Sequence, residues 1–576
     1  RTVVGYRQTN GWARTRTVYF AMEFSKPFKS YGFKNFGKED YKGFWRKFDQ
    51  TRNFPEMAGK QIRVYFDFDT VPNEKVKIKF AVSPVSTDGA MANLKAEIPH
   101  WDFERTKRES QAEWNRELRK VSVTTIGEGE MVNFYTALYH ALLTPTVYMD
   151  RDGQYKGIDQ NVHNATRKLP FTVGDMRDSA PFIHYTTFSL WDTYRALHPL
   201  MNVIQPSRNR DMIRSMLAHY EQSVHKMLPV WSHYANENWC MIGYHSVSVI
   251  ADAIVKGNFT GPEAMKALEA SAQTGRTKYY DGLEYYMQLS YVPEDKNSSS
   301  VSKTLEYAYD DWCIAQAAKK LNRTDIYNEF INRSENWRNV WDRSTGFMRP
   351  KMSDGKFREK FDALSTHGQG FIEGNAWNYS LYVPHNPGAM IELMGGKEKF
   401  SKHMDELFTM HLPDEFFAET EDITREGIIG NYVHGNEPAH HAAYLYNWTD
   451  DPWKTQDRVR MILKNQYRPT PDGLGGNDDC GQMSAWYLFS ALGFYPVAPG
   501  SDRYSLGSPV VRSAKLTLEN GRALNIEARD QSEKNVYVES VSLNGRKLNR
   551  HYLTHSEIMN GGTLVFQMSS RPRTSL

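Results

Sequence analysis

Two adjacent aspartates, Asp478 and Asp479, lie in the glycine-rich stretch GGNDDCGQ at 475–482. Glycine and asparagine at this density indicate a loop, and an apolar helical pattern begins directly after it. Aspartates at such a point commonly cap the helix by accepting hydrogen bonds from its first amides. The same carboxylates, held on a loop, can also bind and deprotonate a water molecule. The sequence leaves both interpretations open.

A second acidic position, Glu373, precedes Gly-Asn and Trp377 in FIEGNAWNYSLYVPHN (371–386). One interpretation is a helix start, where the helix dipole favours a carboxylate. The other is a general acid in an aromatic, poorly hydrated pocket that keeps it protonated near neutral pH. An acid and a separate carboxylate base make an inverting glycosidase when they lie about 6.5–9.5 Å apart. Glu373 and Asp479 are candidates for such a pair.

The stretch FSLWDTYRALHPL (188–200) places Asp192 after Trp191 and three residues before Arg195. Acidic and basic residues at this spacing commonly form an ion pair on a helix surface. The functional interpretation is a carboxylate that binds substrate hydroxyls beside an aromatic wall. Aromatic side chains, which make up 13% of the chain, serve large cores as well as such walls.

A fourth acidic stretch, NYVHGNEPAHHAAYLYN (431–447), places Glu437 among Asn436, His434 and two adjacent histidines. Adjacent histidines point in different directions on a helix, which argues against a zinc face of the HExxH type. Asparagine and glutamate oxygens suit a hard cation such as calcium better. Alone, this stretch is a weak metal motif.

The composition of the 576 residues excludes several classes. There are 71 basic and 68 acidic residues, and no long basic stripe indicates a nucleic-acid partner. No apolar run is long enough for a transmembrane helix, and no signal peptide is recognisable. Three cysteines, Cys240, Cys313 and Cys480, exclude a disulfide framework and a four-cysteine zinc site.

The elements that must position these acids follow from periodicity. Residues 1–100 are rich in strand patterns, beginning with the first residues, and we expect a β-domain that lacks its earliest strands. Residues 101–128 are predicted to form a charged helical linker. Amphipathic helices alternate with loops over 129–497, a length that suits an (α/α)6 barrel better than a four-helix bundle. Strand patterns return in 498–576, and we expect these last strands to pack on the first domain.

Several long motifs resemble glycoside hydrolase family 92, the calcium-dependent exo-α-mannosidases. They run through nearly the whole chain: GYRQTNGWA (5–13), EFSKPF (23–28), SLWDTYR (189–195), CMIGYHSVSVIADA (240–253), TLEYAYDDW (304–312), EGNAWNY (373–379), HGNEPAHHAAYLYN (434–447) and the stretch from PDGLGGNDDCGQMSAW to SLGSP (471–509). The resemblance implies an N-terminal β-sandwich, here incomplete, joined by a helical linker to an (α/α)6 barrel with a C-terminal β segment.

The implied activity is hydrolysis of terminal α-mannosides of glycans with inversion, by general acid/base catalysis with Ca²⁺ assistance. Glu373 is then expected to be the general acid and Asp479 the general base, with Asp478 a partner of the base. The family's second acid, two residues before the base, is Asn477 here, which leaves the roles within this turn open. The other expected site residues are Trp191, Asp192, Trp377, His434 and Asn477 for the substrate, and Glu437, Asn436 and Asn375 for calcium.

The resemblance also implies a periplasmic or secreted protein whose partner is an α-mannoside glycan, with no nucleic acid and no membrane span. Linkage specificity is expected to depend on variable loops, among them FFAETEDITREG (416–427), and on the β-domain. The departure at Asn477 leaves an alternative, a catalytically impaired mannose-binding protein of the same fold. Oligomeric state is not predicted.

Overall fold

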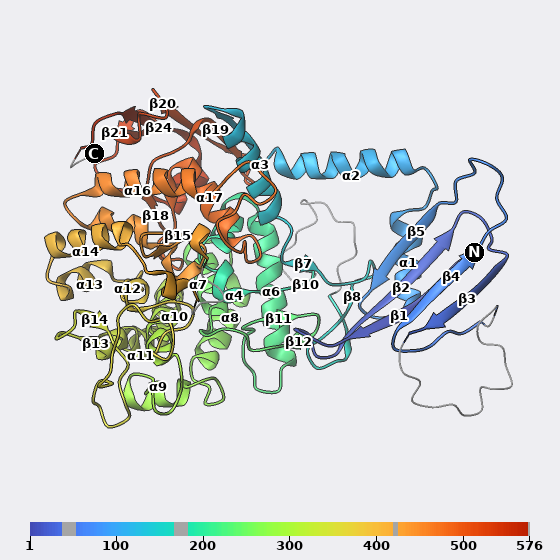
Figure 1. The fold of residues 1–576 in the computed structure, drawn as a ribbon, viewed down its shortest axis with the longest axis horizontal. Helices are drawn as coiled ribbons and strands as arrows, with labels where there is room; N and C mark the ends of the chain where they lie inside the picture. Colours follow the sequence, from blue (N-terminus) through green and yellow to red (C-terminus); the bar gives the residue numbers. More distant parts are fainter. Residues whose placement is uncertain (37–52, 54, 166–181, 419–423, 574–576) are drawn as a thin grey trace.

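A computed structural model describes residues 1–36, 53, 55–165, 182–418 and 424–573. Figure 1 shows a β-rich N-terminal part, a helical body and a C-terminal sheet that lies on the body. Helix α2 (Phe103–Leu118) spans from the first part to the second. Asp102 caps α2 by accepting a hydrogen bond from the amide of Arg105 at 3.0 Å, and no residue of α2 is buried. The predicted charged linker is therefore a solvent-exposed helix.

The N-terminal strands form two small sheets. In one, β2 (Arg16–Phe24) pairs antiparallel with β1 (Thr2–Thr9) and with β5 (Ile78–Ser83). In the other, β3 (Ser30–Asn35) pairs with β4 (Ile62–Asp67). The strand patterns predicted in this region are thus confirmed.

A helix that the strand patterns did not predict, α1 (Thr87–Glu97), packs on the three-stranded sheet. Its Ala90 and Leu94 meet Ala21 of β2 in a small buried cluster. The Ser86 hydroxyl accepts a hydrogen bond from an amide of the first turn, as serine at a helix N-cap does. The region is therefore β-rich but not all β.

The helical body has inner helices buried along nearly their whole length and outer helices with one exposed face. A helix without a polar face must lie inside a protein, whereas an amphipathic helix lies at its surface. The inner helices are α5 (Leu197–Ile204), α7 (Ser246–Val255), α10 (Ser300–Lys320) and α17 (Gln482–Leu492). The outer ones are α3 (Glu128–Ala141), α6 (Pro206–Gln222), α8 (Gly261–Thr274), α11 (Thr324–Arg333), α14 (Lys397–Thr409) and α16 (Pro452–Asn465). This is the layered helical barrel that the sequence predicts.

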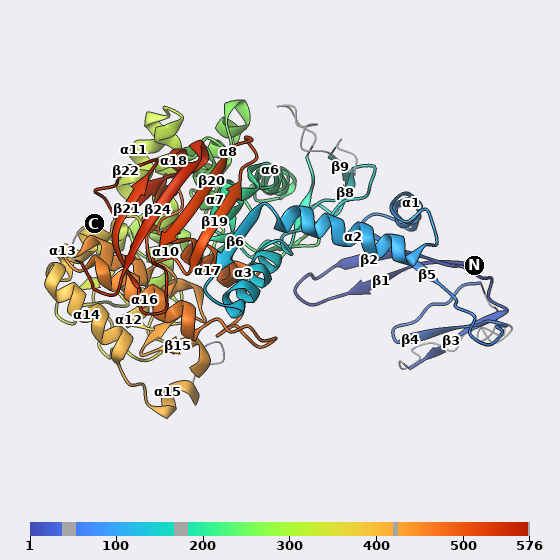
Figure 2. The ribbon, with the colours of Figure 1, turned by 90° about the horizontal axis from the view of Figure 1, so that it is seen from above.

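The C-terminal strands form a six-stranded sheet in the order β22-β21-β24-β20-β19-β6. Its members are β6 (Val121–Thr125), β19 (Val511–Thr517), β20 (Ala523–Arg529), β21 (Tyr537–Leu543), β22 (Arg546–Lys547) and β24 (Gly562–Ser569). Asn544 and Gly545 form the predicted hairpin turn with positive φ angles of 52° and 78°. The sheet covers the helical body (Figure 2), so the expectation that it packs on the first domain is wrong.

The reason for this error is β6, which pairs antiparallel with β19 and so becomes the edge of the C-terminal sheet. The predicted linker region thus contributes a strand to a sheet whose other strands are about 400 residues later in the chain. Within the described part of the chain, no helix has the length and apolar character needed to cross a bilayer.

Candidate active site

Three carboxylic acids meet where loops of the helical body converge. Asp192 belongs to the short helix α4 (Leu190–Thr193), Glu437 opens the 3₁₀ helix η5 (Glu437–Ala439), and Asp479 lies in the turn before α17. One oxygen of each acid lies within 4.8 Å of those of the other two. Asp192 and Glu437 are buried and Asp479 is half-buried. We call these three residues the acid cluster.

Three glycines allow the loops of Glu437 and Asp479 to approach each other. A Cβ on Gly476 would lie 2.5 Å from the Cα of Gly435, and a Cβ on Gly435 would lie 3.0 Å from the Cα of Gly427. These distances are shorter than van der Waals contact, so a side chain would push the backbones apart. The glycine-rich composition before the two aspartates is therefore required by backbone-to-backbone packing.

The acid cluster is electrostatically unfavourable without a ligand. Burial raises the pKa of Asp192 well above its usual range, and the charge of Asp479 raises it further. The hydrogen bond that the Ser189 hydroxyl donates to Asp192 and the charge of Arg195 act in the opposite direction and lower this pKa. Burial also raises the pKa of Glu437, with Asp192 and Asp479 adding to the shift. Among the described residues, Oδ1 of Asp192 and both carboxylate oxygens of Glu437 are buried without a hydrogen-bond partner. Such oxygens are costly unless a cation or a donor meets them, so the cluster is suited to a ligand.

The arginine near this cluster is not on the surface. Both Arg195 and Asp192 are buried, which excludes the surface ion pair that their spacing indicated. The Arg195 Nε donates to the backbone carbonyl of Trp191 at 3.0 Å, and its guanidinium lies over the ring of Tyr194. Its positive charge lowers the pKa values of Asp192 and Glu437, so it partly compensates the negative charge of the acid cluster.

Glu373 lies near the acid cluster: its charge adds to the raised pKa of Asp192, and Asn436 connects it with Glu437. Asn436 joins the two: its Nδ2 donates to the backbone carbonyl of Glu373 at 2.8 Å and to Glu373 Oε2 at 3.2 Å, and its Oδ1 accepts from the amide of Glu437. Glu373 and Asp479 both adopt left-handed backbone conformations, with φ of 47° and 45°. Strained backbone of this kind concentrates at functional sites, where the surrounding structure holds it.

The two adjacent aspartates have different environments. Asp478 accepts hydrogen bonds from the amide and the hydroxyl of Ser484, both at 2.9 Å, and its Oδ2 lies 3.3 Å from Nδ1 of His140. The hydrogen bond to Asp478 raises the pKa of His140. Asp478 thus fixes the start of α17, whereas Asp479 joins the acid cluster and Asn477 is exposed. The helix-start interpretation of this turn is thus met by Asp478, and Asp479 is the aspartate that faces the other acids.

The side chains of three other predicted site residues make contacts within the fold. Asn375 caps α12 (Ala376–Tyr379), because its Oδ1 accepts hydrogen bonds from the first amides of that helix. The ring of Trp377 stacks on His403 with centroids 4.4 Å apart. His434 is buried, and each of its ring nitrogens pairs with a tyrosine hydroxyl. These residues support the loops around the acid cluster.

An aromatic wall extends from the acid cluster to the N-terminal part. Trp191, next to Asp192, packs with Trp231 and Ile372 in a small apolar cluster. Trp12, from the loop between β1 and β2, stacks on Trp231 with centroids 5.8 Å apart and is 59% exposed. Sequence reasoning gave Trp12 no role. The Asn-Gly pair before it marks the turn, but nothing in the sequence shows which part of the body the turn reaches.

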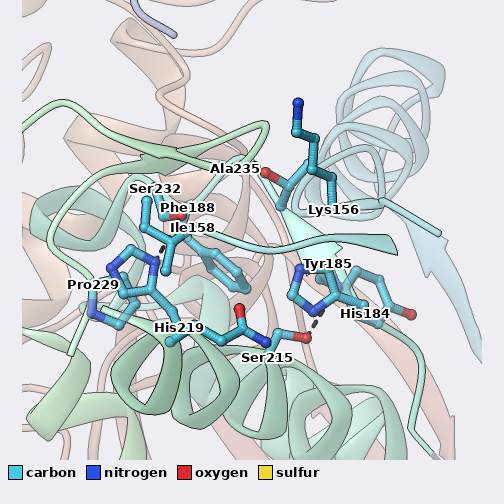
Figure 3. Close-up of a pocket in the computed structure, with 12 residues that line it drawn as sticks. Lys156, Ile158, His184, Tyr185, Phe188, Ser215, His219, Pro229, Ser232 and Ala235 are labelled. Atoms are coloured by element: carbon cyan, nitrogen blue, oxygen red, sulfur yellow. Dashed lines mark hydrogen bonds between the residues drawn. The ribbon is translucent and has the colours of Figure 1, made fainter. Parts of the chain in front are cut away.

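Figure 3 shows a different cavity, lined by residues that include His184, Ser215, His219 and Ser232. Its volume is about 20 Å³, which is room for about one water molecule. Neither Glu373 nor any member of the acid cluster lines it. This cavity is therefore a packing feature between β10 (Tyr185–Thr186) and α6 and not the acid site.

A helical barrel that presents carboxylic acids from several loops, with an aromatic wall beside them, has the elements of a glycoside hydrolase. The chain belongs to glycosyl hydrolase family 92. The N-terminal domain of that family matches residues 1–83, and its catalytic domain matches residues 89–570.

Among solved structures, the chain is similar to the family GH92 α-mannosidase BT3965 from Bacteroides thetaiotaomicron. The two are 44% identical with a TM-score of 0.90, over 100% of this chain and 73% of that one. The structure of BT3965 in complex with mannoimidazole gives 43% identity and a TM-score of 0.91, with the same coverage. The family GH92 inverting mannosidase BT2199 from B. thetaiotaomicron VPI-5482 is 33% identical, with a TM-score of 0.87, over 100% of this chain and 76% of that one.

A curated relative from Arthroderma benhamiae, described as an uncharacterized secreted glycosidase, is 24% identical over 547 residues. The match covers 87% of this chain, and the chain spans 62% of the length of that relative.

Proposed function

We propose that this protein is an inverting, exo-acting α-mannosidase that hydrolyses terminal α-mannosides of glycans by general acid/base catalysis with calcium assistance. The observation that carries the proposal is the acid cluster of Asp192, Glu437 and Asp479 with Glu373 beside it. Membership of family 92 and the likeness to two mannosidases support the same reaction class.

In this mechanism Glu373 is the general acid that donates a proton to the glycosidic oxygen. Asn436 holds its carboxyl group by donating to Oε2, and this fixes where the proton is delivered. Asp479 is the general base that takes a proton from the attacking water. The two residues come from different loops, which allows them to act on opposite faces of the sugar, the arrangement that inversion uses. Asp478 anchors the helix behind Asp479 and so positions the base.

The acid cluster also fits a calcium ion. Asp192, Glu437 and Asp479 supply hard oxygen donors, and the unpartnered buried oxygens of Asp192 and Glu437 are the atoms that a cation would satisfy. When bound, calcium supplies Lewis-acid and templating chemistry toward sugar hydroxyls. Asn436 and Asn375, expected as ligands, have their side chains engaged on Glu373 and on a helix cap, so we assign them to support of the loops.

The subsite beyond the cleaved bond is proposed to lie along the aromatic wall of Trp191, Trp231 and Trp12. Trp191 and Trp231 are buried and support the wall, whereas the exposed indole ring of Trp12 suits the apolar face of a second sugar. The loop 416–427, expected to influence linkage specificity, is described only in part, because residues 419–423 lie outside the described residues. For location we propose a secreted or periplasmic protein, on the strength of the secreted relative.

The proposal is tested by measuring mannose release from a panel of α-mannobioses, with calcium and with EDTA, while NMR identifies the anomer. β-Mannose released only with calcium is the expected result. E373Q and D479N should each lower kcat by about 10³-fold or more, the size of effect expected for an essential acid or base. Binding of mannose without turnover of any linkage would instead support the alternative, a catalytically impaired mannose-binding protein.

A further inference from the structure

A buried hydrogen-bond hub lies behind the acid cluster, on helix α10. Glu306, which is fully buried, accepts hydrogen bonds through Oε1 from Trp191 Nε1 at 3.1 Å and from the Tyr379 hydroxyl at 3.2 Å. Trp191 directly precedes Asp192, and Tyr379 ends α12, six residues after Glu373. A single carboxylate oxygen therefore connects the element that carries Asp192 with the element that follows the general acid.

The other oxygen of Glu306 is held from the opposite side. Nε2 of His245 lies 2.8 Å from Glu306 Oε2, and Nδ1 of the same ring lies 2.8 Å from Asp310 Oδ1. Because both ring nitrogens face carboxylates, His245 donates from both and is an imidazolium. Burial lowers the pKa of His245, but Asp310 and Glu306 raise it to about 9, which agrees with this assignment. The imidazolium is thus the charge partner of Glu306 in its fully buried position.

Further contacts fix the imidazolium. The ring of His245 stacks on Tyr194 with centroids 4.3 Å apart, and the amide of Tyr244 donates to Asp310 at 2.8 Å. A Cβ on Gly243 would lie 2.1 Å from His245 Nε2, so only glycine leaves room for the ring. Apart from Tyr194, these residues belong to the motifs 240–253 and 304–312, to which sequence analysis gave no role.

We propose that Glu306 is a positioning residue: by bridging Trp191 and Tyr379, and backed by His245 and Asp310, it fixes the distance between Asp192 and the general acid Glu373. The proposal rests on the proposed mannosidase function. It assigns Glu306 no contact with substrate. Its effect is to hold two walls of the sugar site, and a misplacement of about 1 Å at such a site costs roughly 100-fold in rate.

The test compares variants of the full chain with a matched control. E306A removes both bridging hydrogen bonds and should lower kcat/KM by about 100-fold, mostly through kcat. E306Q keeps an acceptor oxygen for Trp191 and Tyr379 and turns its amide nitrogen toward His245 Nε2, which accepts from it once the ring is neutral. E306Q should therefore recover activity to within about tenfold of wild type. The control is D311N, on the same helix: Asp311 is equally buried, but its hydrogen bonds go to the hydroxyls of Tyr244 and Tyr286 and to Arg333. D311N should lower the melting temperature and leave kcat/KM within about twofold of wild type.

A binding measurement separates this inference from the function on which it rests. Calorimetric titration with mannoimidazole should show affinity at least tenfold weaker for E306A than for wild type, and no such loss for D311N. If E306A loses no more activity and binding than D311N at equal loss of melting temperature, Glu306 is only a structural residue and the inference is overturned.

Two further measurements cover the cases in which E306A does not fold or the wild type shows no activity. If E306A does not fold, Y379F removes only the hydroxyl that donates to Glu306 and should lower kcat about tenfold; unchanged kcat in Y379F overturns the inference. If the wild type releases no mannose from any α-mannoside, the proposed function fails, and the mannoimidazole affinities of E306A and D311N alone decide the inference.

Discussion

Replacing Glu437 by glutamine should stabilise the metal-free protein. Glu437 shares with Asp192 and Asp479 a site in which one oxygen of each acid lies within 4.8 Å of the others. Two unit charges at 4.8 Å repel by about 3.5 kcal/mol at an effective dielectric constant of about 20. Proton uptake already relieves part of this repulsion, because the pKa values of Asp192 and Glu437 are raised. We therefore expect E437Q to gain about 2–3 kcal/mol in EDTA.

This gain can be converted into a melting temperature. Unfolding of the catalytic unit, residues 89–570, has an entropy of about 1 kcal/mol/K at about 2.1 cal/mol/K per residue. E437Q should therefore melt about 2–3 °C above wild type in EDTA by differential scanning fluorimetry. Calcium at about 100 times its Kd should raise wild type by about 2.7 kcal/mol, or about 3 °C, and should leave E437Q unchanged.

The pH dependence has a defined sign. Because the folded-state pKa values of Asp192 and Glu437 are raised, the stability contributed by their protonated forms is present at low pH and is lost as pH rises through those values. The advantage of E437Q over wild type in EDTA should thus grow from pH 5 to pH 8. D311N, in which a buried acid loses satisfied hydrogen bonds, should instead melt lower and keep the calcium response. A lower melting temperature for E437Q with an intact calcium shift would refute the reasoning, because Glu437 would then stabilise the fold by itself.

The turn before α17 should separate into two functions. D479A should lower kcat by about 10³-fold or more with a melting temperature no lower than that of wild type, because it removes a catalytic base and one charge of the acid cluster. D478A should lose about 1–2 kcal/mol of stability with its two hydrogen bonds to Ser484; the opposite pattern would exchange their roles. W12A should raise KM for α-mannobioses about tenfold and leave hydrolysis of α-mannosyl fluoride unchanged; equal losses on both substrates would show that Trp12 supports the fold and not the acceptor subsite. G476A should lower both the melting temperature and kcat, because its Cβ would lie 2.5 Å from Gly435; a variant with wild-type stability would show that the loops can separate without cost.

Local rules predicted most elements of this protein. The strand patterns of residues 18–24, the charged helix after Asp102 and the Asn-Gly hairpin at Asn544 each have a local cause, and each is present in the structure. The pairing of β6 with β19 could not be predicted, because it depends on a contact between segments about 390 residues apart.

The site shows the same division between local and long-range causes. Residue types marked Glu373, Asp479, Asp192 and Glu437 as candidates, since carboxylic acids are the groups that glycoside hydrolysis uses. Their convergence depends on tertiary structure: loops far apart in sequence meet only when the barrel closes. The hub at Glu306 was missed for the same reason, because a glutamate in a helical pattern is ordinarily expected on the surface.

The glycine contacts between the loops of Glu437 and Asp479 determine where this protein can be redesigned. Gly427, Gly435 and Gly476 meet backbone to backbone, so libraries that vary these positions should yield mostly misfolded proteins. The hairpin of Trp12 lies outside this packing, and we expect its exposed tip to tolerate changes in length and side chain at little cost to stability. Selection for new linkage preference should therefore diversify residues 10–15 and leave the catalytic turns constant.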